Sequence, residues 1–360
     1  MVGAAGLGKL DVSVNTMPLL GKSEGVRRYI EELMREFSRM DSLTARPLGV
    51  ENVRSRTTRM LTVPKLGFPV RQLSEAVVSP VLRMKSTDVF HYTDTYGPLY
   101  GGKVPTVITV HDTTFITHRE SHDAWVANWL GFMCRRTWGN AKQIIAVSDV
   151  TARDIINLGV DPDKVTVVHH GIDHTSHNEG EQIDRLKNVP YFAYLGNIEP
   201  RKGLPVLIEA FKTALPFLPS DCVLAIAGKN AWGDEVEQLV GNESRILILG
   251  RIDEESIWPF MKNSLAFVYP SQYEGFGLPP LEALNLGANV IVGDTPVARE
   301  TLQGHARYFP PSDSKRLTEM LIESISPTGH NVAAQLQYAR KFTWAHAADR
   351  TLEVYRRALE

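Results

Sequence analysis

Short apolar runs rich in β-branched residues recur along the whole chain, and segments with helical periodicity separate most of them. Strands that alternate with helices predict an α/β protein whose parallel sheets are covered by helices on both faces, the doubly wound architecture. Ligands bind at the carboxyl ends of the strands in such sheets. The runs lie at Leu10–Val14, Val104–Val110, Gln143–Val147, Val165–Val168, Tyr191–Leu195, Val223–Ala227, Ile246–Leu249, Leu265–Tyr269 and Val290–Val292.

Chain length and one polar stretch predict the domain organisation. With 360 residues the chain is longer than most single domains, which favours two α/β domains. The segment after Asp173 is polar and lacks apolar periodicity until a new strand begins near Pro190. We therefore predict one doubly wound domain over residues 1–174 and a second over residues 175–341.

The overall composition excludes several classes of protein. The chain is 43% hydrophobic and 22% charged with a net charge of -2, which argues against a disordered protein and against a nucleic-acid binder. Cys134 and Cys222 have no CxxC spacing and suit a reducing compartment. No apolar run approaches the ~18 residues of a membrane-spanning helix, and the N-terminus lacks a signal-peptide pattern. We expect the protein to work in the cytoplasm.

One segment departs from this neutral average. Between Arg54 and Lys85 the sequence has seven arginines and lysines but only one acid, Glu75, with apolar residues between them. Such a segment fits an anionic membrane surface or a lipid-linked acceptor, at the inner face of the cytoplasmic membrane. A solvated loop and helix face whose charges pair elsewhere explains it equally well.

The most informative motif runs from Ser271 to Gly287 and has the layout strand, glycine loop, helix. Its glycines allow close backbone approaches, and Pro279 and Pro280 fit the first turn of a helix. The free amides of that helix end favour an anion such as a diphosphate. Glu274 and Glu282 frame the loop, and carboxylates accept hydrogen bonds from the vicinal hydroxyls of sugars. Either glutamate alone would be read as a capping or surface acid.

This motif resembles the E-x7-E signature of the retaining glycosyltransferases with the GT-B fold, often called family 4. The resemblance implies two Rossmann-like domains facing across a cleft, with a C-terminal helix over about 342–360 that rejoins the first domain. It also implies that Glu274 lies by the transferred sugar and that Glu282 holds the nucleotide ribose. Backbone amides that contact the sugar and phosphates would come from the loop between them, at Gly275, Phe276, Gly277 and Leu278.

A second candidate site motif follows the strand at Tyr191–Leu195 and contains Gly196, Arg201 and Lys202. Adjacent cations stabilise the charge that grows on a leaving diphosphate, a task that metal ions also perform. A solvated basic loop is the structural alternative, but the family has similar sequences here. We expect no metal and no cofactor. Asp161-Pro162-Asp163 resembles a metal-binding acid pair, but a proline between two acids before a strand is typical of a turn. Contacts to the nucleotide base are expected from Arg251 and Ile252.

The N-terminal half contributes His111, which ends the strand Val104–Val110 and resembles the family's sugar-contacting histidine, with Asp112 in a weaker supporting role. Paired glycines are frequent in an N-terminal loop of the family near the acceptor and phosphates. Only Gly25 matches that loop here, so the acceptor contacts around Glu24 and Arg27 stay open.

The resemblance implies a retaining hexosyltransferase, and overall similarity to bacterial mannosyltransferases favours transfer of mannose from GDP-mannose to a glycan or lipid-linked acceptor in polysaccharide biosynthesis. The sequence does not name the sugar, so a UDP-glucose or N-acetylglucosamine donor stays open. An inactive sugar-nucleotide-binding partner subunit is the alternative outside enzymes.

Overall fold

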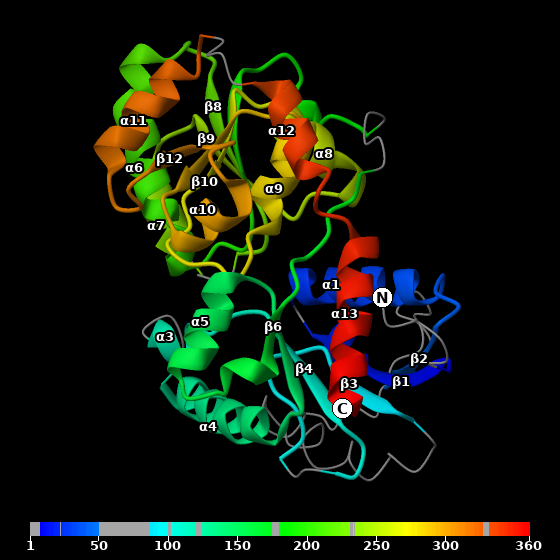
Figure 1. The fold of residues 1–360 in the computed structure, drawn as a ribbon. Helices are drawn as coiled ribbons and strands as arrows, with labels where there is room; N and C mark the ends of the chain where they lie inside the picture. Colours follow the sequence, from blue (N-terminus) through cyan, green and yellow to red (C-terminus); the bar gives the residue numbers. More distant parts are fainter. Residues whose placement is uncertain are drawn as a thin grey trace. The chain divides into compact units, whose positions relative to one another are not determined.

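The structure is a computed structural model that describes residues 8–21, 23–49, 87–99, 102–119, 124–174, 180–230, 233, 235–326 and 331–360. The chain divides into two compact units (Figure 1). The first unit contains Met1–Gly171 and Trp344–Glu360, and the second contains Ile172–Thr343. The C-terminal helix therefore belongs to the first unit, although it follows the second in sequence.

The first unit is built on a six-stranded parallel sheet with the order β2-β1-β3-β4-β5-β6. Its strands are β1 (Leu10–Asn15), β2 (Leu43–Leu48), β3 (Val89–Tyr92), β4 (Thr106–Val110), β5 (Gln143–Ala146) and β6 (Val165–Val167). Its helices are η1 (Met17–Leu20), α1 (Glu24–Phe37), α3 (Thr114–Thr117), α4 (Ala124–Asn140), α5 (Asp149–Asn157), η3 (Pro162–Lys164) and α13 (Trp344–Leu359).

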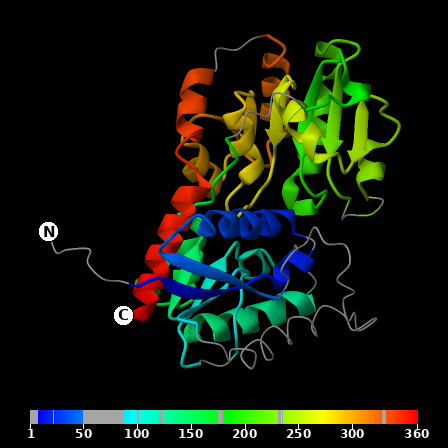
Figure 2. The ribbon, with the colours of Figure 1, turned by 90° about the vertical axis from the view of Figure 1, so that its right-hand side faces the viewer.

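Alternate residues of these strands enter cores on opposite faces of the sheet. Val89 and Val107 pack with α1 and α13, whereas their neighbours Phe90 and Ile108 pack with α4. Figure 2 shows α1 and α4 on opposite sides of the strands. The period of two along each strand thus buries both faces, as a doubly wound sheet requires.

The second unit has a six-stranded parallel sheet with the order β12-β11-β10-β7-β8-β9. Its strands are β7 (Tyr191–Leu195), β8 (Val223–Ala227), β9 (Ile246–Gly250), β10 (Ala266–Tyr269), β11 (Val290–Gly293) and β12 (Arg307–Phe309). Its helices are η4 (Asp184–Leu186), η5 (Pro200–Lys202), α6 (Leu204–Ala214), η6 (Leu215–Phe217), α7 (Glu235–Val240), α8 (Glu254–Lys262), α9 (Leu278–Asn285), α10 (Pro296–Leu302), α11 (Ser314–Glu323) and α12 (Val332–Ala339).

Strand order fixes where a ligand site can form in the second unit. The chain runs outward from β7 to β8 and β9, then returns to the other side of β7 with β10, β11 and β12. The switch point therefore lies between β7 and β10. The carboxyl ends of the strands at a switch point are where doubly wound sheets bind ligands.

Several details bear on the sequence-based expectations. Cys134 and Cys222 are buried free thiols. Asp161 accepts a hydrogen bond from the Asp163 amide at 3.1 Å, which makes that acid pair part of a turn. Among the described residues, no helix is long and apolar enough to cross a membrane. The predicted membrane-contact segment Arg54–Lys85 lies outside the described residues.

Candidate active site

The loops that follow β7 and β10 are joined at the switch point of the second unit. The Gln272 amide donates a hydrogen bond to the Arg201 carbonyl at 3.0 Å. Gly203 has a φ of +70°, and a Cβ added there would lie 2.1 Å from the Pro270 carbonyl oxygen. Only glycine allows the two backbones to approach this closely, so Gly203 fixes the distance between the loops.

This junction brings Lys202, Tyr269 and Glu274 into mutual contact. Lys202 Nζ lies 2.5 Å from Glu274 Oε1 and 3.0 Å from the Tyr269 hydroxyl. The Tyr269 hydroxyl in turn donates to Glu274 Oε1 at 3.0 Å. Lys202 is the only lysine or arginine, and Glu282 the only Asp or Glu, among the described residues that the fold buries, at 7% and 5% exposure. Burying such charges is costly unless they are paired, so the Lys202–Glu274 contact stabilises this arrangement.

Electrostatics keeps Glu274 ionised in this setting. Burial alone raises the pKa of Glu274, but Lys202 and Arg201 outweigh it and hold the pKa below its ordinary value. Burial and the neighbouring carboxylate raise the pKa of Tyr269 well above its ordinary value. Tyr269 therefore stays a protonated donor beside the ionised Glu274 at neutral pH.

Arg201 lies at the edge of this cluster, with a side chain 20% exposed. Its Nε donates to Glu199 Oε2 at 3.0 Å, and Nη1 lies 3.8 Å from Glu274 Oε2. Nη1 also donates to the Tyr273 carbonyl at 3.4 Å. These contacts hold the guanidinium at the carboxyl ends of β7 and β10. An incoming phosphate would share Arg201 and Lys202 with the two carboxylates already beside them.

The glycine loop leads into α9 as the sequence pattern predicts. Gly277 has a φ of +85° and immediately precedes the helix Leu278–Asn285, whose first turn contains Pro279 and Pro280. The left-handed conformation turns the chain sharply, so α9 begins four residues after Glu274. Phe276 is buried, and its ring centroid lies 6.1 Å from that of Phe342. Glu282 lies within α9.

The other residues predicted to contact the donor lie just after β7 and β9. Gly196 directly follows β7, and a Cβ added at Gly228 after β8 would lie 1.8 Å from the Gly196 carbonyl oxygen. The Gly228 amide donates to the Gly250 carbonyl at 2.7 Å, which joins the ends of β8 and β9. Arg251 is exposed and Ile252 partly exposed just beyond this junction. The same sheet therefore has Gly196, Arg251 and Ile252 at the carboxyl ends of its strands.

His111 occupies the carboxyl end of β4 in the first unit. Its Nε2 lies 2.9 Å from the Thr93 carbonyl, and its ring packs edge-on against Tyr29 at 4.9 Å and stacks on His170 at 5.5 Å. Burial lowers the pKa of His111, partly opposed by Asp94. A neutral ring that donates from Nε2 to a carbonyl keeps Nδ1 as an acceptor, which suits a sugar hydroxyl.

Two predicted N-terminal residues have local structural settings. Asp112 Oδ1 accepts hydrogen bonds from the Thr114 amide at 3.1 Å and the Thr114 hydroxyl at 2.8 Å, so Asp112 supports the start of α3. Gly25 is the second residue of α1, within its first turn rather than in a loop. The Ser23 hydroxyl caps this helix by accepting from the Val26 amide at 3.5 Å.

Sequence reasoning missed Tyr269 and Glu199. Tyr269 is the last residue of β10, where an aromatic side chain is typical of the core, and only its position at a strand end signals a site. Glu199 precedes the Arg201-Lys202 pair, and its role in holding Arg201 depends on the fold of η5.

Comparison with known proteins follows the same division of the chain. Residues 23–176 match the model of Glycosyltransferase Family 4, and residues 177–341 match that of Glycosyl transferases group 1. O-antigen chain mannosyltransferase B of Escherichia coli is 27% identical over 265 residues, covering 69% of this chain and 70% of the relative. O-antigen chain mannosyltransferase RfbU of Salmonella typhimurium is 27% identical over 237 residues, covering 63% of this chain and 64% of the relative.

A solved structure has the same fold. Anabaena HepE, crystallised with UDP and glucose, superposes with a TM-score of 0.71 at 18% identity, covering 96% of this chain and 98% of HepE. The two doubly wound units are those of the GT-B architecture. From the two family models and the fold, the chain is a member of the GT-B glycosyltransferases whose halves are described as Glycosyltransferase Family 4 and Glycosyl transferases group 1.

Proposed function

We propose that the protein transfers mannose from GDP-mannose, with retention of configuration, to a glycan or lipid-linked acceptor in polysaccharide synthesis. The contact of Lys202 and Arg201 with Glu274 at the switch point carries the proposal, because it concentrates cations beside a sugar-binding carboxylate. The names of the two mannosyltransferase relatives support mannose as the sugar.

Transfer requires the bond between the anomeric carbon and the donor phosphate to break. Arg201, Lys202 and the backbone amides of the loop from Gly275 to Leu278 would stabilise the negative charge that develops on the leaving diphosphate. Glu274 would hold the transferred sugar and Glu282 the ribose. Loss of the leaving group and attack by the acceptor from the same face would then preserve the anomeric configuration.

No metal is needed for this scheme, because two side-chain cations and these backbone amides provide the positive charge. His111 would contact the sugar through Nδ1, with Nε2 fixed on the Thr93 carbonyl. Gly196, Arg251 and Ile252 would border the nucleotide. We infer that the enzyme uses donor made in the cytoplasm.

A donor such as UDP-glucose is the main alternative within enzymes. Outside enzymes, the chain would bind a sugar nucleotide without turnover. The ionised Glu274 and the two adjacent cations favour an active enzyme, because together they match the charges that sugar transfer from a diphosphate requires.

Thermal unfolding with GDP-, UDP- and ADP-sugars tests the donor first. A donor at about 100 times its Kd stabilises the folded protein by ~2.7 kcal/mol. We expect GDP-mannose to raise Tm most and to be consumed when acceptor extract is added. Stabilisation by UDP-glucose instead would contradict the donor, and stabilisation without GDP release would contradict the activity.

A further inference from the structure

Helix α4 of the first unit exposes aromatic side chains to solvent. Trp125 is 55% and Phe132 is 61% exposed, and Trp129 stacks on Trp125 with ring centroids 6.3 Å apart. Steps of four and three residues place all three on one face of the helix, where Trp125 and Phe132 are exposed and Trp129 packs against the core with its Nε1 buried. The opposite face supplies the core contacts of α4, through Ala127, Met133, Cys134, Thr137 and Trp138. Large exposed apolar groups that gather on one face mark an interaction surface.

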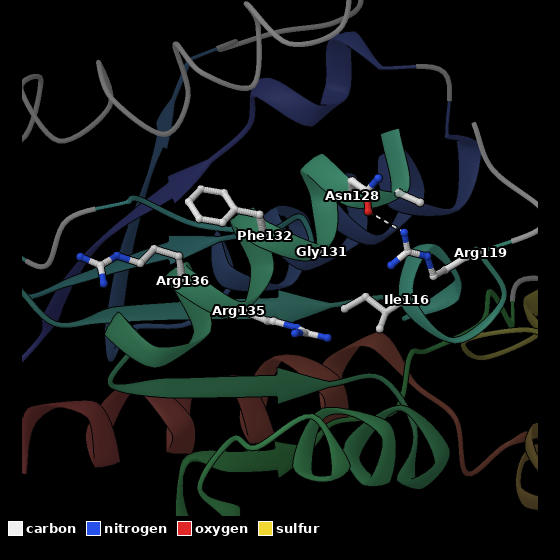
Figure 3. A pocket seen from close by; sticks show the side chains of 8 residues that line it. Ile116, Arg119, Asn128, Gly131, Phe132, Arg135 and Arg136 are labelled. Atoms are coloured by element: carbon white, nitrogen blue, oxygen red, sulfur yellow. Dashed lines mark hydrogen bonds between the residues drawn. The ribbon is translucent and has the colours of Figure 1, made fainter. Parts of the chain in front are cut away.

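Arginines accompany these aromatic residues. Arg136 continues the same face one turn beyond Phe132, and Arg119 and Arg135 border a hollow of about 500 Å³ together with Asn128 and Phe132 (Figure 3). Arg119 Nη2 donates to Asn128 Oδ1 at 2.5 Å, which holds that guanidinium at the rim. Helix α4 contains no Asp or Glu. None of the ion pairs among the described residues involves Arg119, Arg135 or Arg136, so these arginines add positive charge beside the exposed aromatic side chains.

We propose that this α4 face, formed by Trp125, Phe132 and Arg136 with Arg135 at its border, binds the surface of an anionic lipid bilayer. Tryptophan and phenylalanine enter the boundary between headgroups and acyl chains, and arginines bind lipid phosphates. The hollow beside Arg119 and Arg135 has room for a phosphate headgroup. The helix would lie in the plane of the interface while its other face stays in the protein core.

The positive charge of the α4 face favours an anionic bilayer over two other partners, a second copy of the chain and its own segment from Arg54 to Lys85. A symmetric dimer through α4 would bring the arginines of both copies together, which is unfavourable. The segment from Arg54 to Lys85 carries the same sign of charge and would repel the same face. An anionic bilayer complements the arginines and also accepts the aromatic side chains.

Vesicle flotation with the full chain tests the proposal. Vesicles of phosphatidylcholine alone are compared with vesicles enriched in phosphatidylglycerol, at low and high salt. Each arginine contributes about 1 kcal/mol at an anionic surface, so R135Q/R136Q should weaken binding to the anionic vesicles by about thirtyfold. W125S/F132S should also weaken the binding that persists at high salt, because that part is apolar.

The matched control is R35Q/R39Q on α1, which removes the same charge from exposed arginines of the same unit. We expect this control to bind vesicles as the wild type does, and thermal unfolding checks that all variants are folded. Equal weakening by control and α4 variants would overturn the proposal, because net charge or another segment would then be responsible. Failure of the wild type to bind anionic vesicles, or a dimer that W125S/F132S dissociates, would also overturn it.

Discussion

Tyr269→Phe removes one hydroxyl from the centre of the candidate site and leaves the ring in place. The hydroxyl contacts Lys202 Nζ and Glu274 Oε1, both at 3.0 Å, and the residue is 5% exposed. Hydrogen bonds to charged groups contribute roughly 1.5–3 kcal/mol each, but the Lys202–Glu274 contact survives the change. We expect a net loss of about 1–3 kcal/mol in unfolding free energy.

Loss of this hydroxyl also frees the ammonium and the carboxylate to move relative to each other. Since about 1.4 kcal/mol corresponds to tenfold in rate, we expect kcat to fall roughly tenfold and KM for the donor to change less. Denaturant unfolding measures the stability, and release of nucleotide diphosphate from the donor measures the rate.

Tyr191→Phe is the matched control. Its hydroxyl donates to the Phe260 carbonyl at 3.0 Å in the same unit, away from the cluster. The control should lose about 1 kcal/mol of stability and keep its kinetics. If both variants keep the wild-type kcat, Tyr269 has only a structural role and the reasoning is refuted.

Three further predictions follow from the other contacts. Glu282→Ala should weaken donor binding in calorimetry, whereas Arg201→Ala should mainly slow transfer; equal loss of binding and rate in both variants would contradict the separate roles. Tyr355→Phe leaves His91 Nδ1 without its 2.7 Å contact, and burial has already lowered the pKa of His91 to about 3, so the neutral ring cannot recover the loss by protonation at neutral pH. We expect a cost of ~1–3 kcal/mol in denaturant unfolding, and an unchanged midpoint would argue against the contact. Because the folded pKa of Glu274 is depressed, its stabilisation is present above the unfolded value of about 4.3 and is lost as the pH falls through the lower folded value. Glu274→Gln should therefore flatten the acid limb of stability against pH, and an identical acid limb would contradict the ion pair.

Three strands escaped the sequence-based prediction, each for a physical reason. β2 is an edge strand that contains Pro47 and is largely half-buried, so it lacks a continuous apolar run. β3 is fully buried but contains His91. Hydrogen bonds with Thr109 and Tyr355 offset the desolvation cost of burying this side chain, and the sequence cannot reveal these contacts. β12 has three residues and lies at the edge of its sheet. The long apolar runs were found because parallel strands buried on both faces are continuously hydrophobic.

The candidate site was predictable where its chemistry is contiguous in sequence. Glu274 and Glu282 lie on the loop and helix that follow β10, and Arg201 and Lys202 lie in the segment that follows β7. Their convergence depends on β7 and β10 being neighbours, which is a property of strand order. The role of Tyr269 was not predicted because it depends on contact with Lys202, which is 67 positions away in sequence.

The anomeric configuration of the product tests the central claim most directly. Wild-type protein and Lys202→Met would be incubated with GDP-mannose and acceptor, and the new glycosidic bond would be examined by NMR. We predict that the wild type forms a mannoside with the configuration of the donor and that Lys202→Met forms it far more slowly. A product of inverted configuration, or equal rates for the two proteins, would contradict the proposed role of the Lys202–Glu274 site.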